Sequence, residues 1–349
     1  MAKLREFIRD VGWPRVIIAL FLLSLFAATP FVDVRLDTSI SDTLIRLGMN
    51  AVMVLAMVPM IQTGCGLNFG LPLGIVAGLL GAVFTIEIGG TGFTGFLTAI
   101  AISSGFAVLF GYGYAQLLNR VKGDEMTIAT YVGFSSVAFM CMMWLLLPLH
   151  SPNMIWGYGG SGLRTTITLE GYWLKVLDDF LAVKVGEHFT FPTGTLLFDG
   201  FICLLVWGFF KTRTGTALTA VGSNPDFARA SGVDVDKMRT ISVILSTWLG
   251  AVGILVYEQS FGFIQLYMGP LYMAFPAVAA ILIGGASVRK ASIANVIIGT
   301  ILFQGILTMT PSVINRLIQS DMSEVIRVVV SNGMIIYALT RRITVRAAR

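Results

Sequence analysis

The residue types that most often carry out catalysis are sparse and scattered in this chain. Its two histidines, His150 and His188, stand apart from each other and from any nucleophile. The three cysteines (Cys65, Cys141 and Cys203) each lie in an apolar stretch, without the paired spacing of a zinc or redox site. No glycine-rich loop ending in lysine is present to bind a nucleotide phosphate. We therefore expect no catalytic residue, no metal site and no cofactor bound by this chain.

A second kind of polar residue consists of amides inside strongly apolar sequence. Gln62 and Asn68 flank a glycine-rich gap, Phe69 follows Asn68, and Gln304 lies in a later apolar run. An amide offers both a donor and an acceptor without a net charge, which suits a neutral, hydroxylated solute, and an aromatic ring can stack on a sugar or base face. These four residues are candidates to line a translocation path. The alternative is that the amides hold neighbouring helices together.

The composition is that of an integral membrane protein. Hydrophobic residues make up 56% of the 349 positions and charged residues only 12%, about half the usual charge of a soluble domain. The formal charge of +5 is not gathered on one segment, so nucleic acid is not an expected partner.

Because a membrane-spanning helix needs about 20 mostly apolar residues, the sequence predicts an all-α polytopic fold, a single transmembrane domain over 1–349. The gap at 64–72 and the interruptions of the eighth span at Gly269-Pro270 and Pro276 predict broken helices that face the path. The ten expected spans are 15–32, 44–63, 70–88, 94–118, 127–148, 194–211, 240–258, 266–286, 292–310 and 324–340.

Lysine and arginine set the expected orientation. With both ends of the chain in the cytoplasm, most of the 24 basic residues fall on the inner side, as the positive-inside rule requires. The segment 149–193 then lies outside as a cap, with an amphipathic stretch near 172–181 along the interface. The first apolar run, from Val16 to Thr29, has a signal peptide as its alternative.

The segment 212–239, on the inner side, carries strong local structural signals. Asn224 is a good N-cap, Pro225 suits the first helical position, and Asp226 complements the helix dipole. Ala228 and Arg229 would continue that helix. Residues 215–221 predict another short helix before it. Two glycines, Gly222 and Gly232, are expected to end these two helices. The segment is therefore expected to be a compact knob of two short helices joined at a glycine corner.

This segment closely resembles the coupling loop of ABC-importer permeases of the ribose/simple-sugar and branched-chain amino-acid group. The run Ala274–Ser287 resembles the apolar run of that group that ends in Gly-Gly-(Thr/Ala)-Ser. The resemblance covers most of the chain, roughly 44–340. In the loop it is carried by Gly215, Ala217, Ala220, Gly222, Asn224, Pro225, Ala228, Gly232 and Val233.

Two departures leave the solute and the assembly open. Residues 65–70 lack the Asp and Ser that many sugar permeases have there and are closer to nucleoside-type relatives. Arg289 and Lys290 stand where relatives usually carry another glycine pair, which suggests one half of a heterodimer, although a homodimer remains an alternative.

The resemblance implies a permease of the bacterial cytoplasmic (inner) membrane for a small polar solute of sugar or nucleoside type. Separate ATPase subunits would use ATP and Mg, and an external binding protein and a second permease would complete the assembly. The residues implied in ATPase coupling are Gly215, Gly222, Asn224, Pro225, Asp226, Ala228, Arg229 and Gly232.

Two other classes compete with this interpretation. An ion-gradient-driven transporter or channel would place ionisable residues deep in the spans, whereas nearly all charges here fall in the predicted loops. A membrane-embedded enzyme would need a convergent catalytic set.

Overall fold

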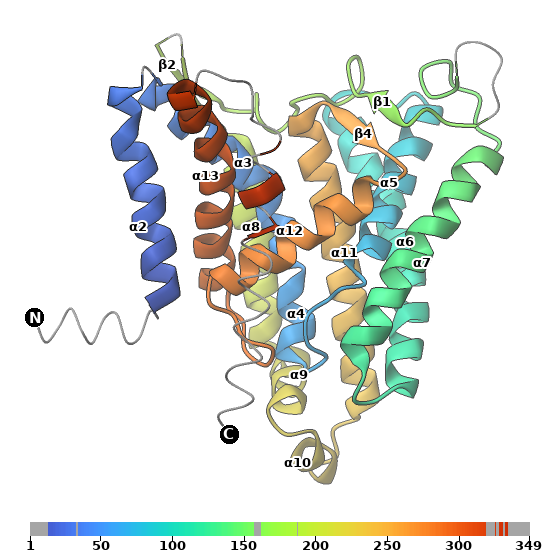
Figure 1. Cartoon of the computed structure of the whole chain (residues 1–349). Coiled ribbons are helices and arrows are strands. Elements are labelled where there is room, and N and C mark those ends of the chain that lie inside the picture. The colour runs from blue at the N-terminus through green and yellow to red at the C-terminus, as the bar shows by residue number, and fades with distance from the viewer. Residues whose placement is uncertain are drawn as a thin grey trace, which may run out of the picture.

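The computed structural model describes residues 13–32, 34–156, 162–186 and 188–318, together with 325, 328–330, 332 and 333. Within these residues the chain is a bundle of long apolar helices, with short strands at one end and two short helices at the other (Figure 1). Most of the expected tenth span, 324–340, lies outside the described residues, as do the basic residues of both chain ends.

Each of the first nine expected spans overlaps an apolar helix. Among the residues that the structure describes, six segments are long and apolar enough to cross a membrane: Leu36–Gln62, Gly92–Arg120, Glu125–Leu146, Thr193–Lys211, Val235–Phe261 and Ile293–Ile314. Three further apolar helices are shorter. The helices are α2 (Trp13–Ala28), α3 (Leu36–Leu55), α4 (Met57–Gln62), α5 (Leu71–Glu87), α6 (Gly92–Arg120), α7 (Glu125–Leu146), α8 (Thr193–Lys211), α9 (Arg213–Ser223), α10 (Pro225–Ala230), α11 (Val235–Phe261), α12 (Gly269–Ile283) and α13 (Ile293–Ile318), with a 3-10 turn at Thr29–Phe31.

The segment between α7 and α8 folds over one end of the bundle. Its strand β1 (Thr166–Thr168) pairs antiparallel with β4 (Phe263–Gln265), which follows α11, and β2 (Val183–Val185) pairs antiparallel with β3 (Phe189–Phe191). These short strands were not expected from the sequence. Residues 172–181 form successive turns, and Trp173 and Leu177 are buried. One side of this stretch packs into the protein, Phe180 and Leu181 on the other side are exposed, and its place along a lipid interface stays a prediction.

One of the two expected helix breaks is present and the other is not. The chain leaves helical geometry between α4 and α5, over 63–70, as predicted. The prediction that Pro276 interrupts the eighth span is wrong, because α12 continues through it. Pro270 lies in the first turn of α12, where no backbone N–H is needed for the helix. A kink not foreseen separates α3 from α4 at Ala56, because Pro59 cannot donate to the carbonyl of Leu55.

Helix α11 packs in the middle of the bundle against α3, α5 and α6. Small residues permit this close packing: a Cβ at Gly74 of α5 would lie 2.6 Å from the carbonyl oxygen of Thr247, and one at Gly78 would lie 2.6 Å from that of Ala251. The packing fixes the buried 63–70 segment against α11.

Candidate functional site

The segment 212–234, which we call the α9–α10 knob, has well-formed helix caps. The side chain of Thr212 accepts a hydrogen bond from the backbone N–H of Gly215 (3.2 Å). The Asn224 side-chain oxygen accepts from the N–H groups of Asp226 (3.1 Å) and Phe227 (3.0 Å), which confirms the predicted N-cap of α10. The N–H groups in the first turn of a helix have no partner within the helix. These side-chain caps bond such groups in both short helices and so stabilise the fold of the knob.

The two glycines expected to end the knob's helices have different roles. Gly232 adopts a left-handed φ of 82° just beyond α10, as predicted. The prediction for Gly222 is wrong, because α9 continues through it to Ser223 and the corner is the extended Asn224. A Cβ at Gly222 would overlap the carbonyl oxygen of Gln62, so this glycine is needed for close packing against the end of α4.

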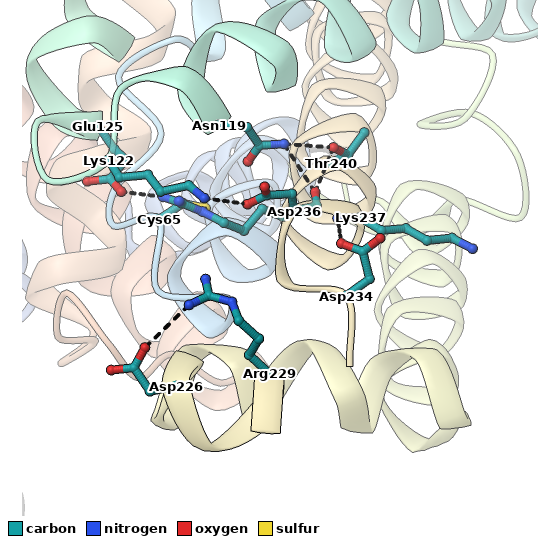
Figure 2. Close-up of polar contacts among 11 residues, drawn as sticks. Cys65, Asn119, Lys122, Glu125, Asp226, Arg229, Asp234, Asp236, Lys237 and Thr240 are labelled. Carbon is teal, nitrogen blue, oxygen red and sulfur yellow. Dashed lines mark hydrogen bonds and ion pairs between the residues drawn. The ribbon is translucent and has the colours of Figure 1, made fainter. Parts of the chain in front are cut away.

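Other predicted knob residues divide into a core and a surface. Ala228 is buried with Val221 and Val235 and holds the two short helices together. Asp226 and Arg229 are exposed and form an ion pair of 3.5 Å along α10 (Figure 2). A pair this exposed contributes little to stability.

Phe227 is the main knob residue that the sequence analysis missed. Its side chain is 68% exposed on α10, between the two polar residues of the exposed pair. The sequence did contain a signal for this residue, namely a single phenylalanine between an N-cap and a helix-ending glycine. A short polar helix has no hydrophobic core that would bury this ring, so the ring is expected at the surface. Exposed aromatic residues at the centre of a surface are typical anchors of protein–protein contacts.

A cavity of about 370 Å³ lies between the knob and the ends of the long helices. The Lys122 ammonium, at its wall, forms an ion pair of 2.8 Å with Asp236 at the start of α11, and the nearby Asn119 amide donates to Thr240 (3.0 Å; Figure 2). The cavity is lined by Thr63, Gly64, Lys122, Glu125, Val221, Gly222, Ser223, Pro225, Asp226, Arg229, Val235, Arg239 and Arg289.

Arg239 is a second residue that the sequence analysis did not single out. It is buried on α11, donates from Nε to the Sγ of Cys65 (3.3 Å), and forms an ion pair with Glu125 at the start of α7. Burial raises the pKa of the Cys65 thiol, although the neighbouring guanidinium of Arg239 opposes this shift. Cys65 is therefore a neutral, shielded thiol at neutral pH.

The four candidate path residues lie in two places. Gln62, Asn68 and Phe69 belong to the α4–α5 break, whereas Gln304 is buried on α13. The Gln62 amide donates to the carbonyl of Ala291.

Both the nitrogen and the oxygen of the Asn68 side-chain amide are hydrogen-bonded. It is fully buried, donates to the Ser246 hydroxyl (2.8 Å) and accepts from the Tyr114 hydroxyl (3.1 Å). In this conformation the amides of Gln62 and Asn68 hold helices together, and their contact with a solute remains a prediction.

The apolar helices packed around α11, the break between α4 and α5 and the capped knob at one end fit a membrane permease. The chain belongs to the family described as branched-chain amino acid transport system / permease component, whose model matches residues 39–339. Membership confirms the resemblance inferred from the knob. Permeases of this kind are the membrane subunits of ABC transporters and work with ATPase subunits and a solute-binding protein.

Individual relatives agree with the family. The chain is 24% identical over 290 residues to the ribose import permease protein RbsC of Escherichia coli K12, covering 82% of each chain. It is 36% identical over 95 residues to the nucleoside ABC transporter permease protein NupC of Lactococcus lactis (26% and 29% covered). Over 113 residues it is 31% identical to the autoinducer 2 import system permease protein LsrC of Escherichia coli O9:H4 (32% of each chain).

A solved structure described as an inward-facing metal-chelate-type ABC transporter aligns with 97% of this chain and 99% of its own. Its TM-score is 0.46 and its sequence identity 13%.

The cap of α10 gives a first prediction. Asn224→Ala removes the acceptor of two backbone hydrogen bonds, so the local stability of 225–230 is expected to fall by about 1 kcal/mol. Hydrogen exchange at the N–H groups of Asp226 and Phe227 should accelerate roughly fivefold. Ser223→Ala is the matched control, since that hydroxyl bonds only one turn back to Thr219. Equal exchange in both variants would contradict a capping role.

Proposed function

We propose that this ABC permease imports a small polar solute of sugar or nucleoside type across the bacterial cytoplasmic membrane. The chain would cross the membrane ten times with both ends in the cytoplasm, and 149–193 would face outward. It would pair with a second permease, receive solute from the external binding protein, and leave ATP and Mg to the ATPase subunits.

The observation that carries the proposal is the α9–α10 knob. Its helices are capped by Thr212 and Asn224, its interior is closed by Ala228, and it presents Phe227 at its surface. A capped, protruding element with an exposed aromatic anchor suits the docking of a soluble subunit. We therefore assign ATPase coupling to the knob, with Phe227 added to the residues predicted from sequence.

Support for a neutral solute comes from the chemistry of the candidate path. The amides Gln62, Asn68 and Gln304 and the ring of Phe69 carry no charge. The similarity to ribose and nucleoside permeases supports the same solute class. A heterodimer is the favoured assembly, because the turn after α12 carries Arg289 and Lys290 in place of small residues.

A reconstituted complex tests the proposal. The permease, its genomic neighbours that encode an ATPase, a binding protein and any second permease would be placed in liposomes, and uptake of labelled ribose, adenosine and leucine compared. We expect ATP-dependent uptake of ribose or adenosine that withstands ionophores. Uptake that stops when ion gradients are dissipated while ATP persists would favour the secondary-transporter alternative and contradict the proposal.

A further inference from the structure

The broken segment between α4 and α5 is connected to several parts of the molecule at once. Gly64 touches the knob, Cys65 is bonded to α11, and Asn68 is bonded to both α6 and α11. Just before the break, Gln62 is bonded to the turn between α12 and α13. A displacement of this short segment would therefore change its contacts with the knob, α6, α11 and α7.

At Gly64 and Gly222 the backbone of the break lies close against the backbone of the knob. A Cβ on Gly64 would lie 3.2 Å from the Cα of Gly222, and one on Gly222 would lie 3.0 Å from the backbone nitrogen of Gly64 and overlap the Gln62 carbonyl. The atoms nearest to these two glycines are backbone atoms, which cannot change rotamer. Close-packed backbones transmit displacement directly.

Arg239 provides a second link between the same parts. Helix α11 leaves the knob at the Asp234 cap, whose side chain accepts from the N–H of Lys237 (3.0 Å). One turn further on, Arg239 donates to Cys65 of the break and forms an ion pair with Glu125 of α7 (Figure 2 labels Cys65 and Glu125). The planar guanidinium fork can bond both partners in a fixed direction, which a lysine ammonium cannot do.

We infer that displacement of the α9–α10 knob is carried through the break at 63–70 to α6 and α11, and that Gly222 and Arg239 are the positioning residues of this route. The inference rests on the proposed role of the knob in ATPase coupling. Gly222 sets the contact distance between knob and break. Arg239 keeps the break aligned with α7 and α11 while the knob moves.

The native Cys65 thiol is a reporter for this route, since it lies in the break and is 2% exposed. In the assembled complex, with Cys141 and Cys203 replaced by serine, the rate of Cys65 alkylation by N-ethylmaleimide would be measured with and without ATP and Mg. We expect a change of at least about tenfold, a shift of about 1.4 kcal/mol in the opening equilibrium. An unchanged rate in a complex that imports solute would overturn the inference.

Gly222→Ala tests the backbone contact. We expect import per ATP hydrolysed to fall at least about tenfold and Cys65 alkylation no longer to respond to ATP. Gly208→Ala in α8 is the matched control, because a Cβ there meets nothing within 4 Å. Full import and a normal Cys65 response in Gly222→Ala would overturn the inference, and if that variant fails to assemble, the wild-type Cys65 measurement decides.

Arg239 is tested by conservative replacement. Arg239→Lys keeps the charge opposite Glu125 but loses the forked contact, so import per ATP is expected to lie between those of wild type and Arg239→Gln. Equal import per ATP by wild type, Arg239→Lys and Arg239→Gln would contradict a role of Arg239 in this route. A complex in which Phe227→Glu leaves ATPase binding intact would instead contradict the proposed function of the knob, so the two failures are distinguishable.

Discussion

A Phe227→Glu variant is expected to lose at least about 30-fold in ATPase affinity, and with it solute-stimulated ATP hydrolysis and import. The ring is 68% exposed on a helix whose backbone is already capped, so its replacement leaves the fold of the permease unchanged. Burying a carboxylate where an aromatic anchor docked costs about 2 kcal/mol or more. Pull-down of the ATPase by the purified permease, followed by ATPase assays of the complex, measures both effects.

Phe180→Glu is the matched control for this variant. Phe180 is 56% exposed and lies in the segment between α7 and α8, at the opposite end of the bundle from the knob (Figure 1). It adds the same charge to an exposed phenylalanine and should leave ATPase binding unchanged. Equal binding by the two variants would contradict the docking role of Phe227.

A large loss of stability is expected from Gly78→Ala. The added methyl group would overlap Ile254 Cγ2 and lie 2.6 Å from the carbonyl oxygen of Ala251. Helices α5 and α11 must then separate, which costs about 1–3 kcal/mol for an overpacked core. The melting temperature of the detergent-purified permease should fall by several degrees.

A glycine on the next helix supplies the comparison. A Cβ at Gly113 of α6 meets nothing within 4 Å, so Gly113→Ala should be neutral or stabilise the helix by about 0.5–1 kcal/mol. A melting temperature that falls equally in both variants would contradict the close approach of α5 to α11 as the cause of the loss.

Most of the helical architecture could be predicted because lipid leaves the chain few choices. Apolar runs such as 94–118 and 240–258 must be helical, since no water is present to satisfy their backbone groups. Predictions from the local sequence were wrong where contacts with residues distant in the sequence determine the structure. Pro276 is a helix breaker by propensity, yet α12 continues through it within the packed bundle. The strand pair β1–β4 joins segments nearly a hundred residues apart, and no local pattern specifies such a pairing.

The knob shows the same division between local and distant causes. The cap at Asn224 and the left-handed Gly232 follow from neighbouring residues and were predicted correctly. Gly222 was misassigned because the need for a glycine there comes from the backbone of Gln62, which is 160 positions away in the sequence. The bond of Arg239 to Cys65 spans a similar separation, and it could not have been foreseen from either residue alone.

The place of α2 in the bundle has a consequence for how the protein is made. This helix packs chiefly against α13, and Arg15 near its start donates to the carbonyl of Gly285 just before that helix (Figure 1). At a synthesis rate of about 5–20 residues per second, α2 must wait on the order of ten seconds or more for α13 to leave the ribosome. Its exposed Ile17, Leu20 and Leu23 suit contact with lipid meanwhile, so α2 is made long before the helix against which it packs.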